Sequence, residues 1–432
     1  MIEIVRYNEG ESNRALDRIR SRGLDANAEL IASVTAIIEG VRSGGDEALV
    51  GYTKQFDGVE LRPKDIRVDP EFIRNAGSKA ESNVIDAFRK AIANVRAFHE
   101  RQRESDWSMA GEDGAIVGQR ILPVGSAGLY VPGGRAAYPS TVVMNAVPAQ
   151  VAGVKRIALA TPPGTLETNP TVAAVINELG IEEVYRVGGA QAIAAFAYGT
   201  ESIARVDKIV GPGNAYVAIA KKLVFGSVGI DSVAGPTEVV VIADHTADPR
   251  FVAADLLAQA EHDEAASAIC ITTDASLAHE IASEVERQLV TLERREIAGA
   301  SIERFGAVFF VESIKAACDL ANLIAPEHLE LMTSDDDRAA SLIENAGAIF
   351  FGPYSSEPVG DYIAGPNHVL PTLGTSRFSS ALSIHDFVRR QSVIRYTREA
   401  LQNNAGSIAA MADSEGLTAH KRAVLLRTGD GG

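Results

Sequence analysis

From Val124 onward, short apolar runs rich in β-branched residues alternate with alanine-rich segments of helical period. Clusters of glycine and proline separate these runs, beginning with the stretch VGSAGLYVPGG. Strands that alternate with helices form parallel sheets, because each helical crossover returns the chain to the same end of the sheet. The sequence therefore predicts an α/β fold.

The expected strands fall into two successive groups. The first group comprises 156–159, 183–187, 208–210 and 239–242, and the second comprises 268–272, 307–311, 329–332 and 348–351. Segments of helical period, such as 276–292, separate the strands. Two similar sheet units, one following the other along the chain, are the simplest account.

Helical patterns flank the two sheet units. Periodic apolar stretches such as 31–41 fill the first hundred residues, and the last fifty return to helical patterns with a basic stretch and a GDGG tail that we expect to fray. We therefore expect four parts, namely a largely helical region at 1–123, sheet domains at 124–236 and 237–381, and a C-terminal helical element at 382–432.

Composition argues against several function classes. The 432 residues include 41 Lys and Arg and 57 Asp and Glu, so 41 − 57 gives a net charge of −16, which repels nucleic-acid phosphates. No apolar run approaches the roughly 18 residues that a membrane helix needs. The first residues, MIEIVRYNEGESNR, carry charges where a signal peptide needs an apolar stretch. We expect a soluble cytoplasmic protein without nucleic-acid or membrane partners.

The chain has two cysteines, Cys270 and Cys318, and both lie within apolar segments. Neither a disulfide framework nor a cysteine zinc cluster is available, so a metal site must use histidine, carboxylate or amide ligands. Both thiols are expected to be small buried apolar residues, which disfavours a mechanism with a nucleophilic thiol.

Three glycine-rich loops follow expected strands, at 130–134 (YVPGG), 187–192 (VGGAQA) and 210–216 (VGPGNAY). The last two lead into helices, where glycines let backbone N–H groups approach an anionic ligand. Ordinary βα turns are the alternative for each loop taken singly. Three such loops in one unit favour a nucleotide site, although no strand is followed by the usual GxGxxG fingerprint.

A helix is expected to begin at Asp248 and Pro249, a capping residue followed by proline, and to run through FVAADLLAQAEHD. Gln259 and His262 near its end are three residues apart and share one face, where an amide oxygen and an imidazole can reach the same metal ion. The alternative is a polar helix end that binds no ligand.

Two proton-transfer groups adjoin each other in the loop IAPEHLEL, namely Glu327 and His328. An imidazole that titrates near neutrality suits a general base toward an alcohol, and a neighbouring carboxylate can activate water. An exposed polar turn is the alternative.

Two further pairs carry acidic and imidazole groups. Asp361 and His368 lie in the loop GDYIAGPNHVLPT after an apolar strand, and α/β sheets bind ligands at such strand ends. Glu415 and His420 lie near the start of the last helix, where a solvated charged face is the alternative. An O,N,O,N ligand set suited to zinc or a similar ion is available in Gln259, His262, Asp361 and His420.

These motifs extend into longer stretches with a distinctive order. They are YVPGG, VGGAQAIAA, VGPGN, IDSVAGPTE, LLAQAEHD, APEHLEL, GDYIAGPNHVLPT and EGLTAH. In this order and at these separations they closely resemble the histidinol dehydrogenase family, and RSGGDEALVGYTKQFDG at 42–58 resembles the family's amino-terminal segment. The resemblance spans nearly the whole chain.

The resemblance implies the last reaction of histidine biosynthesis, in which two molecules of NAD oxidise L-histidinol through the aldehyde to L-histidine. It implies one zinc ion per subunit of a homodimer, with ligands Gln259, His262 and Asp361 from one subunit and His420 from its partner. By the same resemblance, His328 is the general base toward the alcohol, Glu327 activates the water that hydrates the aldehyde, and zinc positions the substrate.

The resemblance also assigns binding residues and a fold. The substrate residues are Thr237, Gln259, His262, His328, Asp361, His368, Glu415 and His420, and the NAD residues are Tyr130, Gln191 and Asn214. The implied fold has two incomplete Rossmann-like parallel-sheet domains with small helical elements at both termini, in an intertwined homodimer.

Three other functions remain open. The same scaffold and loops could oxidise a different small alcohol with NAD, because a scaffold does not fix the substrate. Glu327 could instead activate a metal-bound water in a zinc hydrolase that needs no nucleotide. The third alternative is a metal-binding dimer without catalytic activity.

Overall fold

The computed structural model of the chain describes residues 2–8, 10, 12–22, 28–133 and 138–429. It contains two compact units. The first comprises Met1–Arg101 and Gly125–Phe387, and the second comprises Gln102–Val124 and Val388–Gly432. Each unit is therefore built from segments that are distant in the sequence.

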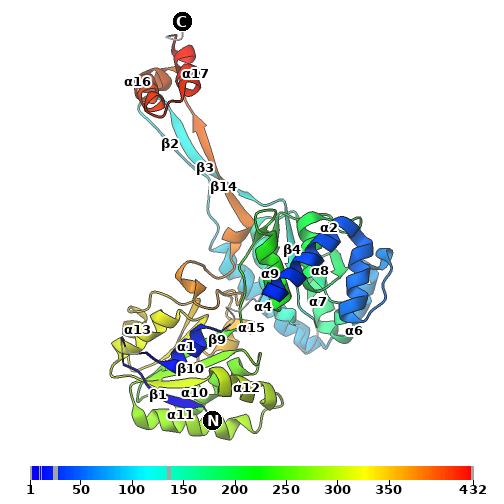
Figure 1. The fold of residues 1–432 in the computed structure, drawn as a ribbon, viewed down its shortest axis with the longest axis vertical. Coiled ribbons are helices and arrows are strands. Elements are labelled where there is room, and N and C mark those ends of the chain that lie inside the picture. Colours follow the sequence, from blue (N-terminus) through cyan, green and yellow to red (C-terminus); the bar gives the residue numbers. More distant parts are fainter. Residues whose placement is uncertain (1, 9, 11, 23–27, 134–137, 430–432) are drawn as a thin grey trace. The chain divides into compact units, whose positions relative to one another are not determined.

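A six-stranded parallel sheet forms one half of the first unit (Figure 1). Its strands, in spatial order, are β1 (Glu3–Arg6), β11 (Ala307–Phe310), β10 (Ser267–Thr272), β9 (Glu238–Ala243), β12 (His328–Met332) and β13 (Ala348–Phe351). The associated helices are α1 (Arg14–Arg20), α10 (Pro249–Ala260), α11 (Ala275–Leu289), α12 (Arg295–Phe305), α13 (Ile314–Ile324), α14 (Asp336–Ala340) and α15 (Glu357–Tyr362).

Helices cover both faces of this sheet, as the uninterrupted apolar strands require. Along β9, Val239 and Val241 share a buried core with α10, α11 and α12. The intervening residues Val240 and Ile242 share a second core with α1 and α13. Successive side chains of a strand point to opposite faces, so β9 is buried on both sides.

A five-stranded parallel sheet forms the other half of the first unit. Its strands, in spatial order, are β6 (Glu183–Arg186), β5 (Arg156–Thr161), β4 (Ser126–Tyr130), β7 (Lys208–Val210) and β8 (Gly229–Ile230). The associated helices are α2 (Ala28–Asp57), α3 (Pro70–Gly77), α4 (Ser82–Glu100), α5 (Pro139–Ala152), α6 (Thr165–Thr168), α7 (Pro170–Glu178), α8 (Gly189–Tyr198) and α9 (Ala215–Val224). Residues of α2, α8 and α9 share one buried core with the strands.

The second unit is an antiparallel sheet with two helices. Its strands, in spatial order, are β14 (Val388–Arg395), β3 (Ile116–Pro123) and β2 (Trp107–Ala110), and α16 (Arg398–Ser414) packs against α17 (Thr418–Thr428). Short 3-10 turns at η1 (Pro63–Asp65), η2 (Thr375–Arg377) and η3 (Ile384–Phe387) belong to the first unit.

The α/β class with two parallel sheets is confirmed, and each expected strand has a counterpart. Strand 239–242, grouped above with the strands that precede it, pairs instead with β10 and β12 in the six-stranded sheet. The division of the chain into 1–123, 124–236, 237–381 and 382–432 stays a proposal.

Four strands, β1, β2, β3 and β14, lie in the terminal parts where helical patterns were expected, and those local expectations are wrong. β1 adds a short edge to the six-stranded sheet, and the basic stretch of the C-terminal part is β14. The partner of β1 is β11, some three hundred residues away, and β14 pairs with β3. Pairing over such distances stabilises short strands that local periodicity cannot indicate.

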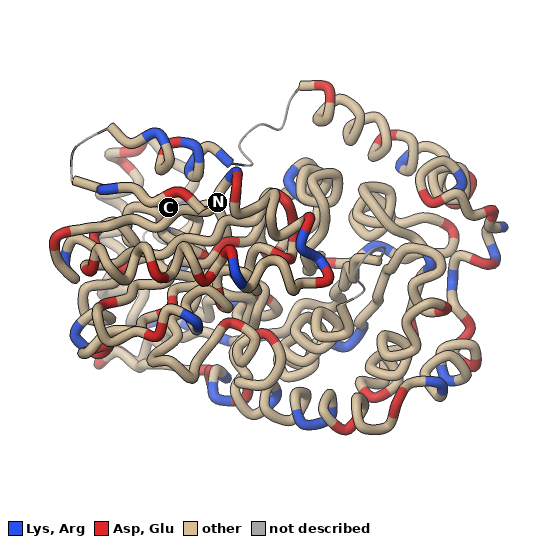
Figure 2. The backbone as a smooth tube through the Cα atoms, turned by 90° about the horizontal axis from the view of Figure 1, so that it is seen from below, with Lys and Arg blue, Asp and Glu red and all other residues tan. Residues whose placement is uncertain are grey.

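Two features of the molecule bear on partner classes. Figure 2 shows acidic and basic positions interspersed along the described chain. None of the described helices is long and apolar enough to cross a membrane.

Candidate active site

The expected proton-transfer pair lies at the amino end of two neighbouring strands. Glu327 immediately precedes β12, and His328 is its first residue. Parallel pairing aligns His328 with Val239 of β9, which brings Thr237 and Glu238 beside the pair. Glu327 and His328 are 6% and 3% exposed, so the alternative of an exposed polar turn is wrong.

His328 is held in one tautomer by its neighbours. Its Nδ1 lies 3.2 Å from the carbonyl oxygen of Glu238 and 3.2 Å from Oε1 of Gln259. Both are acceptors, so Nδ1 carries the hydrogen of the neutral ring. The Nε2 atom is buried without a hydrogen-bond partner among the described residues, which leaves its lone pair free to take a proton.

Glu327 is buried and receives two hydrogen bonds on one oxygen. The hydroxyl of Thr237 and the N–H of Glu238, at 3.0 Å, both donate to Oε2. Burial raises the pKa of the Glu327 carboxyl to about 7, because the ionised form loses its hydration. A carboxyl group with this pKa changes its charge near neutral pH, as a proton-transfer group must.

Gln259 connects these groups. It is completely buried in the last turn of α10, donates from Nε2 to the Thr237 hydroxyl at 3.0 Å, and accepts from His328 on Oε1. A chain of hydrogen bonds therefore runs from His328 through Gln259 and Thr237 to Glu327. In the structure, the Gln259 amide is hydrogen-bonded to His328 and Thr237. The role of Gln259 as a metal ligand stays a proposal.

Three side chains converge as a possible metal site. One ligand atom from each of His262, Glu357 and Asp361 lies within 4.8 Å of the others. His262 Nε2 is 3.6 Å from Glu357 Oε1, and the second Glu357 oxygen is buried without a partner among the described residues. One imidazole and two carboxylates are ligands that zinc accepts, so the donor set fits a divalent ion.

The positions of His262 and Asp361 differ from the sequence expectations. The helix begins at Asp248 and Pro249 as predicted, but α10 ends at Ala260, and His262 lies in the following turn. Asp361 is part of the short helix α15, not of a loop.

Glu357 is the site residue that sequence reasoning missed. It precedes Asp361 by four residues, and this spacing places both carboxylates on one face of α15. The acidic pair flanking Pro358 and Gly360 was the available signal, but the proline and glycines favoured a loop. Four-residue spacing has meaning only once a helix is assigned.

A further buried carboxyl group, that of Glu330, binds the backbone of Glu357. Glu330 of β12 accepts a 2.7 Å hydrogen bond from the N–H of Glu357. Burial and the neighbouring Asp255 raise the pKa of Glu330 well above its ordinary range, and burial raises that of Asp255 to about 6. These shifts favour the protonated form of Glu330, which limits the negative charge beside the candidate metal site.

The electrostatics of the imidazoles follow the surrounding carboxylates. Burial alone would lower the pKa of His328 and of His262, but Glu357 and other nearby carboxylates outweigh it and raise both values. His368 differs, because burial lowers its pKa despite its proximity to Asp361. Its Nδ1 lies 3.2 Å from the Asp361 carbonyl oxygen, so His368 supports the backbone that carries Asp361.

The location of this site contradicts the expectation drawn from strand ends. Asp361 and His368 were expected at the carboxyl end of a strand, where α/β sheets bind ligands. The cluster instead adjoins Thr237, Glu327 and His328, at the amino ends of β9 and β12. In the six-stranded sheet, the candidate site therefore lies at the amino ends of the strands, whereas α/β sheets usually bind ligands at the carboxyl ends.

Glu415 and His420 belong to the second unit. Glu415 is the C-cap residue of α16 and His420 lies in the first turn of α17. Both side chains are exposed. Their proposed roles in the site are not tested by these positions.

The glycine-rich loops lie at the carboxyl edge of the five-stranded sheet. Tyr130 ends β4, and its hydroxyl accepts a 3.0 Å hydrogen bond from the N–H of Gly189, which follows β6. Burial raises the pKa of Tyr130 to about 12, so its hydroxyl stays protonated. Gly134, the last residue of the YVPGG loop, lies outside the described residues.

A buried ion pair supports the loop after β7. Lys221 pairs with Asp231, and these side chains bind the carbonyl and the N–H of Gly211 at 2.9 and 2.8 Å. Gly211 has φ of +119°, and a Cβ there would lie 2.2 Å from the Tyr130 carbonyl oxygen, so only glycine fits. The nearby Asn145 amide is buried without a partner among the described residues.

The other two residues assigned to NAD lie in the following helices. Gln191 is buried in the first turn of α8. Asn214 is exposed and caps α9 by accepting from the N–H of Val217. Glycines, helix N-termini and an unpaired amide at one sheet edge are features that fit an anionic nucleotide.

Both cysteines are buried, as expected. Burial raises the pKa of Cys270 strongly and raises that of Cys318 to about 11. A thiol that is protonated at neutral pH is a poor nucleophile. The thiol mechanism therefore finds no support in the structure.

Comparison with known proteins identifies the family. The family model for histidinol dehydrogenase matches residues 20–428. The histidinol dehydrogenase of Geobacillus kaustophilus is 54% identical over 396 residues, covering 91% of this chain and 93% of that protein. That of Aquifex aeolicus is 48% identical over 429 residues, covering 99% of this chain and 100% of that protein.

A solved structure agrees with these sequence matches. The crystal structure of histidinol dehydrogenase from Elizabethkingia anophelis superposes with a TM-score of 0.92 at 38% sequence identity, covering 99% of this chain and 98% of that one. Family model, relatives and structure all extend over nearly the full length. The chain belongs to the histidinol dehydrogenase family of oxidoreductases.

Proposed function

We propose that this chain oxidises L-histidinol through the aldehyde to L-histidine, the last step of histidine biosynthesis, with two molecules of NAD and one zinc ion per subunit. The observation that carries the proposal is the arrangement of His328 and Glu327 beside His262, Glu357 and Asp361. We place the reaction in the cytoplasm.

His328 acts as the general base in the oxidation of the alcohol. Its hydrogen is fixed on Nδ1, so Nε2 can take the hydroxyl proton as the hydride leaves the carbinol carbon. Removal of the proton during hydride departure avoids a protonated carbonyl of high energy. The surrounding carboxylates, which raise the pKa of His328, stabilise the imidazolium that results.

Glu327 serves the second oxidation. An aldehyde has no hydroxyl proton to lose, so water must add to it before a second hydride can leave. The ionised carboxyl of Glu327 takes a proton from this water as it adds to the aldehyde, and the imidazolium left on His328 by the first oxidation returns its proton to the carbonyl oxygen. The resulting hydrate again presents a hydroxyl to the neutral His328. The two side chains lie 3.8 Å apart, which permits both steps at one site.

The proposed zinc ligands are Gln259, His262 and Asp361, with His420 of the partner subunit, and the structure adds Glu357 as a further candidate. When bound, zinc supplies fixed coordination for nitrogen atoms of the substrate and thereby orients the reacting carbon. Thr237, His368 and Glu415 complete the proposed substrate residues. Glu415 can balance the positive charge of the substrate.

The proposed NAD residues are Tyr130, Gln191 and Asn214, on the glycine loops of the five-stranded sheet. Backbone N–H groups at the start of α8 and α9 suit the pyrophosphate, and Gly211 permits a close approach of the backbone. This accounts for a dinucleotide site without GxGxxG.

The exposed position of His420 supports the proposal of a homodimer. His420 and Glu415 are exposed residues of the second unit, whereas the other proposed ligands lie in the first. We propose that the second unit supplies these two residues to the site of the partner subunit, so that a monomer is inactive.

One assay tests the proposed reaction. Protein stripped with a chelator should be inactive, and addition of zinc, NAD and L-histidinol should restore two NADH per L-histidine formed. One NADH per histidinol would mean that the aldehyde escapes and that Glu327 does not hydrate it. NADH formation from other small alcohols but not from histidinol would overturn the assignment of histidinol as the substrate.

A further inference from the structure

A single residue, Glu238, touches both proton-transfer groups through its backbone. Its N–H donates to Glu327 Oε2 at 3.0 Å, and its carbonyl oxygen accepts from His328 Nδ1 at 3.2 Å. The N–H and C=O of one strand residue point toward the same neighbouring strand, which here is β12. The backbone of Glu238 therefore fixes the orientation of Glu327 and the tautomer of His328 together.

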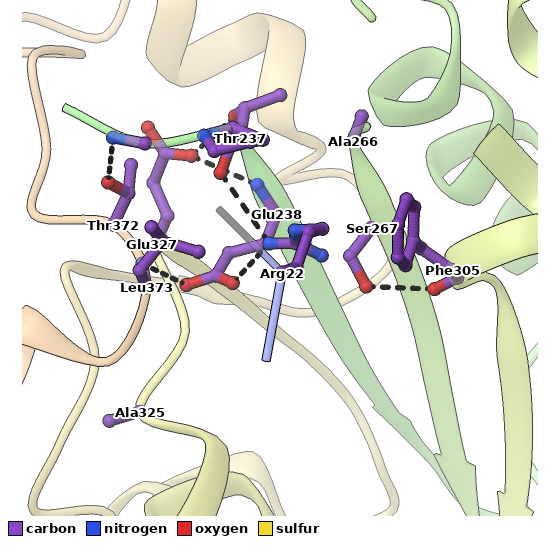
Figure 3. Close-up of polar contacts among 12 residues, drawn as sticks. Arg22, Thr237, Glu238, Ala266, Ser267, Phe305, Ala325, Glu327, Thr372 and Leu373 are labelled. Atoms are coloured by element: carbon purple, nitrogen blue, oxygen red, sulfur yellow. Dashed lines mark hydrogen bonds and ion pairs between the residues drawn. The ribbon is translucent and has the colours of Figure 1, made fainter. Parts of the chain in front are cut away.

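The side chain of Glu238 is anchored by two further contacts (Figure 3). Its Oε2 forms a 2.6 Å ion pair with Arg22, and its Oε1 accepts a 3.0 Å hydrogen bond from the N–H of Leu373. The side chains of Arg22 and Glu238 are 1% and 4% exposed. This pair joins the end of the first helix to the start of β9, across 216 residues.

The anchoring contacts also hold a strained loop. Leu373 has φ of 53°, in the left-handed region that is unfavourable for a leucine. The neighbouring Thr372 hydroxyl accepts a 2.7 Å hydrogen bond from the N–H of Gly235, three residues before Glu238. Such a conformation persists only where surrounding contacts enforce it, so the start of β9 is rigidly held.

A buried ion pair is an expensive way to stabilise a fold. Two charges lose their hydration, and an apolar pair of similar volume often gives equal or greater stability. The pair lies directly behind Glu327, where Thr237 and Glu238 both donate to the same carboxylate oxygen. The position of this ion pair therefore indicates that it orients the groups of the active site.

We propose that Glu238, clamped by Arg22, is the positioning residue that orients both proton-transfer groups of the active site. The inference rests on the function proposed above and extends it to residues without contact with substrate. It predicts that loss of the clamp misplaces Glu327 and His328 together and lowers the rate of both oxidation steps.

The clamp, which is the ion pair between Arg22 and Glu238, also determines the charge around Glu327. The charged groups that face this carboxyl are Glu238 and Arg22 behind it, its neighbour His328, and His262 beyond α10. The charge of Glu238 disfavours ionisation of Glu327, and Arg22 offsets it. Loss of Arg22 should therefore shift the acidic limb of the pH–rate profile to higher pH, and loss of the Glu238 charge should shift it lower.

The experiment compares R22M, E238Q and the double variant with wild type, all loaded with zinc and assayed with NAD and L-histidinol. We expect kcat to fall on the order of 10- to 100-fold with a small change in KM, because misplacement of reacting groups costs rate more than binding. The acidic limbs of the two single variants should move in opposite directions. In the double variant the acidic limb of the pH–rate profile should return to its wild-type position, whereas kcat should remain low.

The matched control is E183Q, which removes the Arg156–Glu183 ion pair between β5 and β6 of the other sheet. It should keep the wild-type kcat and pH profile. If a single variant does not fold, the double variant is tested in its place, because it leaves no unpaired buried charge. Its kcat then decides whether the ion pair orients the site. Active wild type together with clamp variants that match E183Q in kcat and pH profile would overturn this inference and leave the proposed function intact. Inactive wild type would overturn the function itself.

Discussion

At the scale of single residues, the site depends on which atom of His328 carries a hydrogen. The Glu238 carbonyl oxygen and the Gln259 amide oxygen both face Nδ1, so the neutral ring exposes an unprotonated Nε2. A base of this type needs no rearrangement before it takes a proton. Glu327, with a pKa near neutrality, complements it with a carboxylate that can act on water.

Replacement of His328 tests the general base. We expect His328→Asn to lower kcat for histidinol by roughly 10²- to 10⁴-fold, because asparagine keeps the polarity but cannot take a proton. KM should change much less. Steady-state NADH formation measures both constants, and His279→Asn on the solvated face of α11 is the control. Near-normal turnover in folded His328→Asn would show that another group is the base.

The pKa of Glu327 predicts a pH dependence for the second oxidation. Burial raises this pKa to about 7, and only the ionised carboxylate can accept a proton from water. The rate with L-histidinal as substrate should therefore fall as the pH drops below about 7. Glu327→Gln should be slow and should keep only the part of the acidic limb that comes from protonation of His328, the base of the hydride step. A wild-type rate that stays constant from pH 8 to pH 5 would contradict the assignment.

The sequence predicted those site residues whose signal is local. Glu327 and His328 adjoin each other, and Gln259 and His262 share a helix end, so their chemistry is visible in short stretches. Glu357 needed the assignment of α15, which its proline and glycine obscured. Arg22 and Glu238 are 216 residues apart, and each alone looks like an ordinary surface charge.

At the scale of elements, the two parallel sheets carry two different candidate sites. The glycine loops lie at the carboxyl edge of the five-stranded sheet, whereas the proton-transfer groups lie at the amino edge of the six-stranded one. Alternating periodicity predicted both sheets, because buried strands and their helices are local patterns. It did not predict β1 and β14, which distant partners stabilise, nor the edge at which the site lies.

A carboxylate connects the carboxyl ends of β9 and β12. Asp244 accepts hydrogen bonds from the N–H and hydroxyl of both Ser334 and Thr246, at 2.6 to 2.9 Å. Burial opposes its ionisation, but these donors outweigh burial and lower the pKa of Asp244 to about 2. A depressed folded-state pKa adds stability that is present above the unfolded value and is lost as the pH falls toward the folded value.

Asp244→Asn should therefore destabilise the protein by about 1 to 2 kcal/mol at neutral pH, and by less as the pH falls from about 4 toward 2. Urea unfolding of wild type and variant between pH 7 and pH 3 measures the difference. The control Asp319→Asn removes a half-exposed partner of Lys315 on α13 and should change stability by less than about 0.5 kcal/mol. A difference between Asp244→Asn and wild type that does not vary with pH would refute this account.

At the scale of the whole molecule, the account requires two chains for one active site. The proposed ligands Gln259, His262 and Asp361 belong to the first unit, whereas His420 is an exposed residue of α17 in the second. The sequence indicated this arrangement only through its resemblance to a family, because one chain's pattern carries no direct signal for a partner. Shared sites of this kind make activity a property of the dimer.

Complementation between two inactive variants tests this central claim most directly. His328→Asn and His420→Ala should each be inactive as homodimers. In a mixed dimer, the His420→Ala subunit keeps its own His328 and receives His420 of the partner subunit, so one of its two sites is complete. Random exchange of equal amounts should therefore restore roughly a quarter of wild-type activity. No recovery in mixed dimers isolated through two different affinity tags would contradict a shared active site.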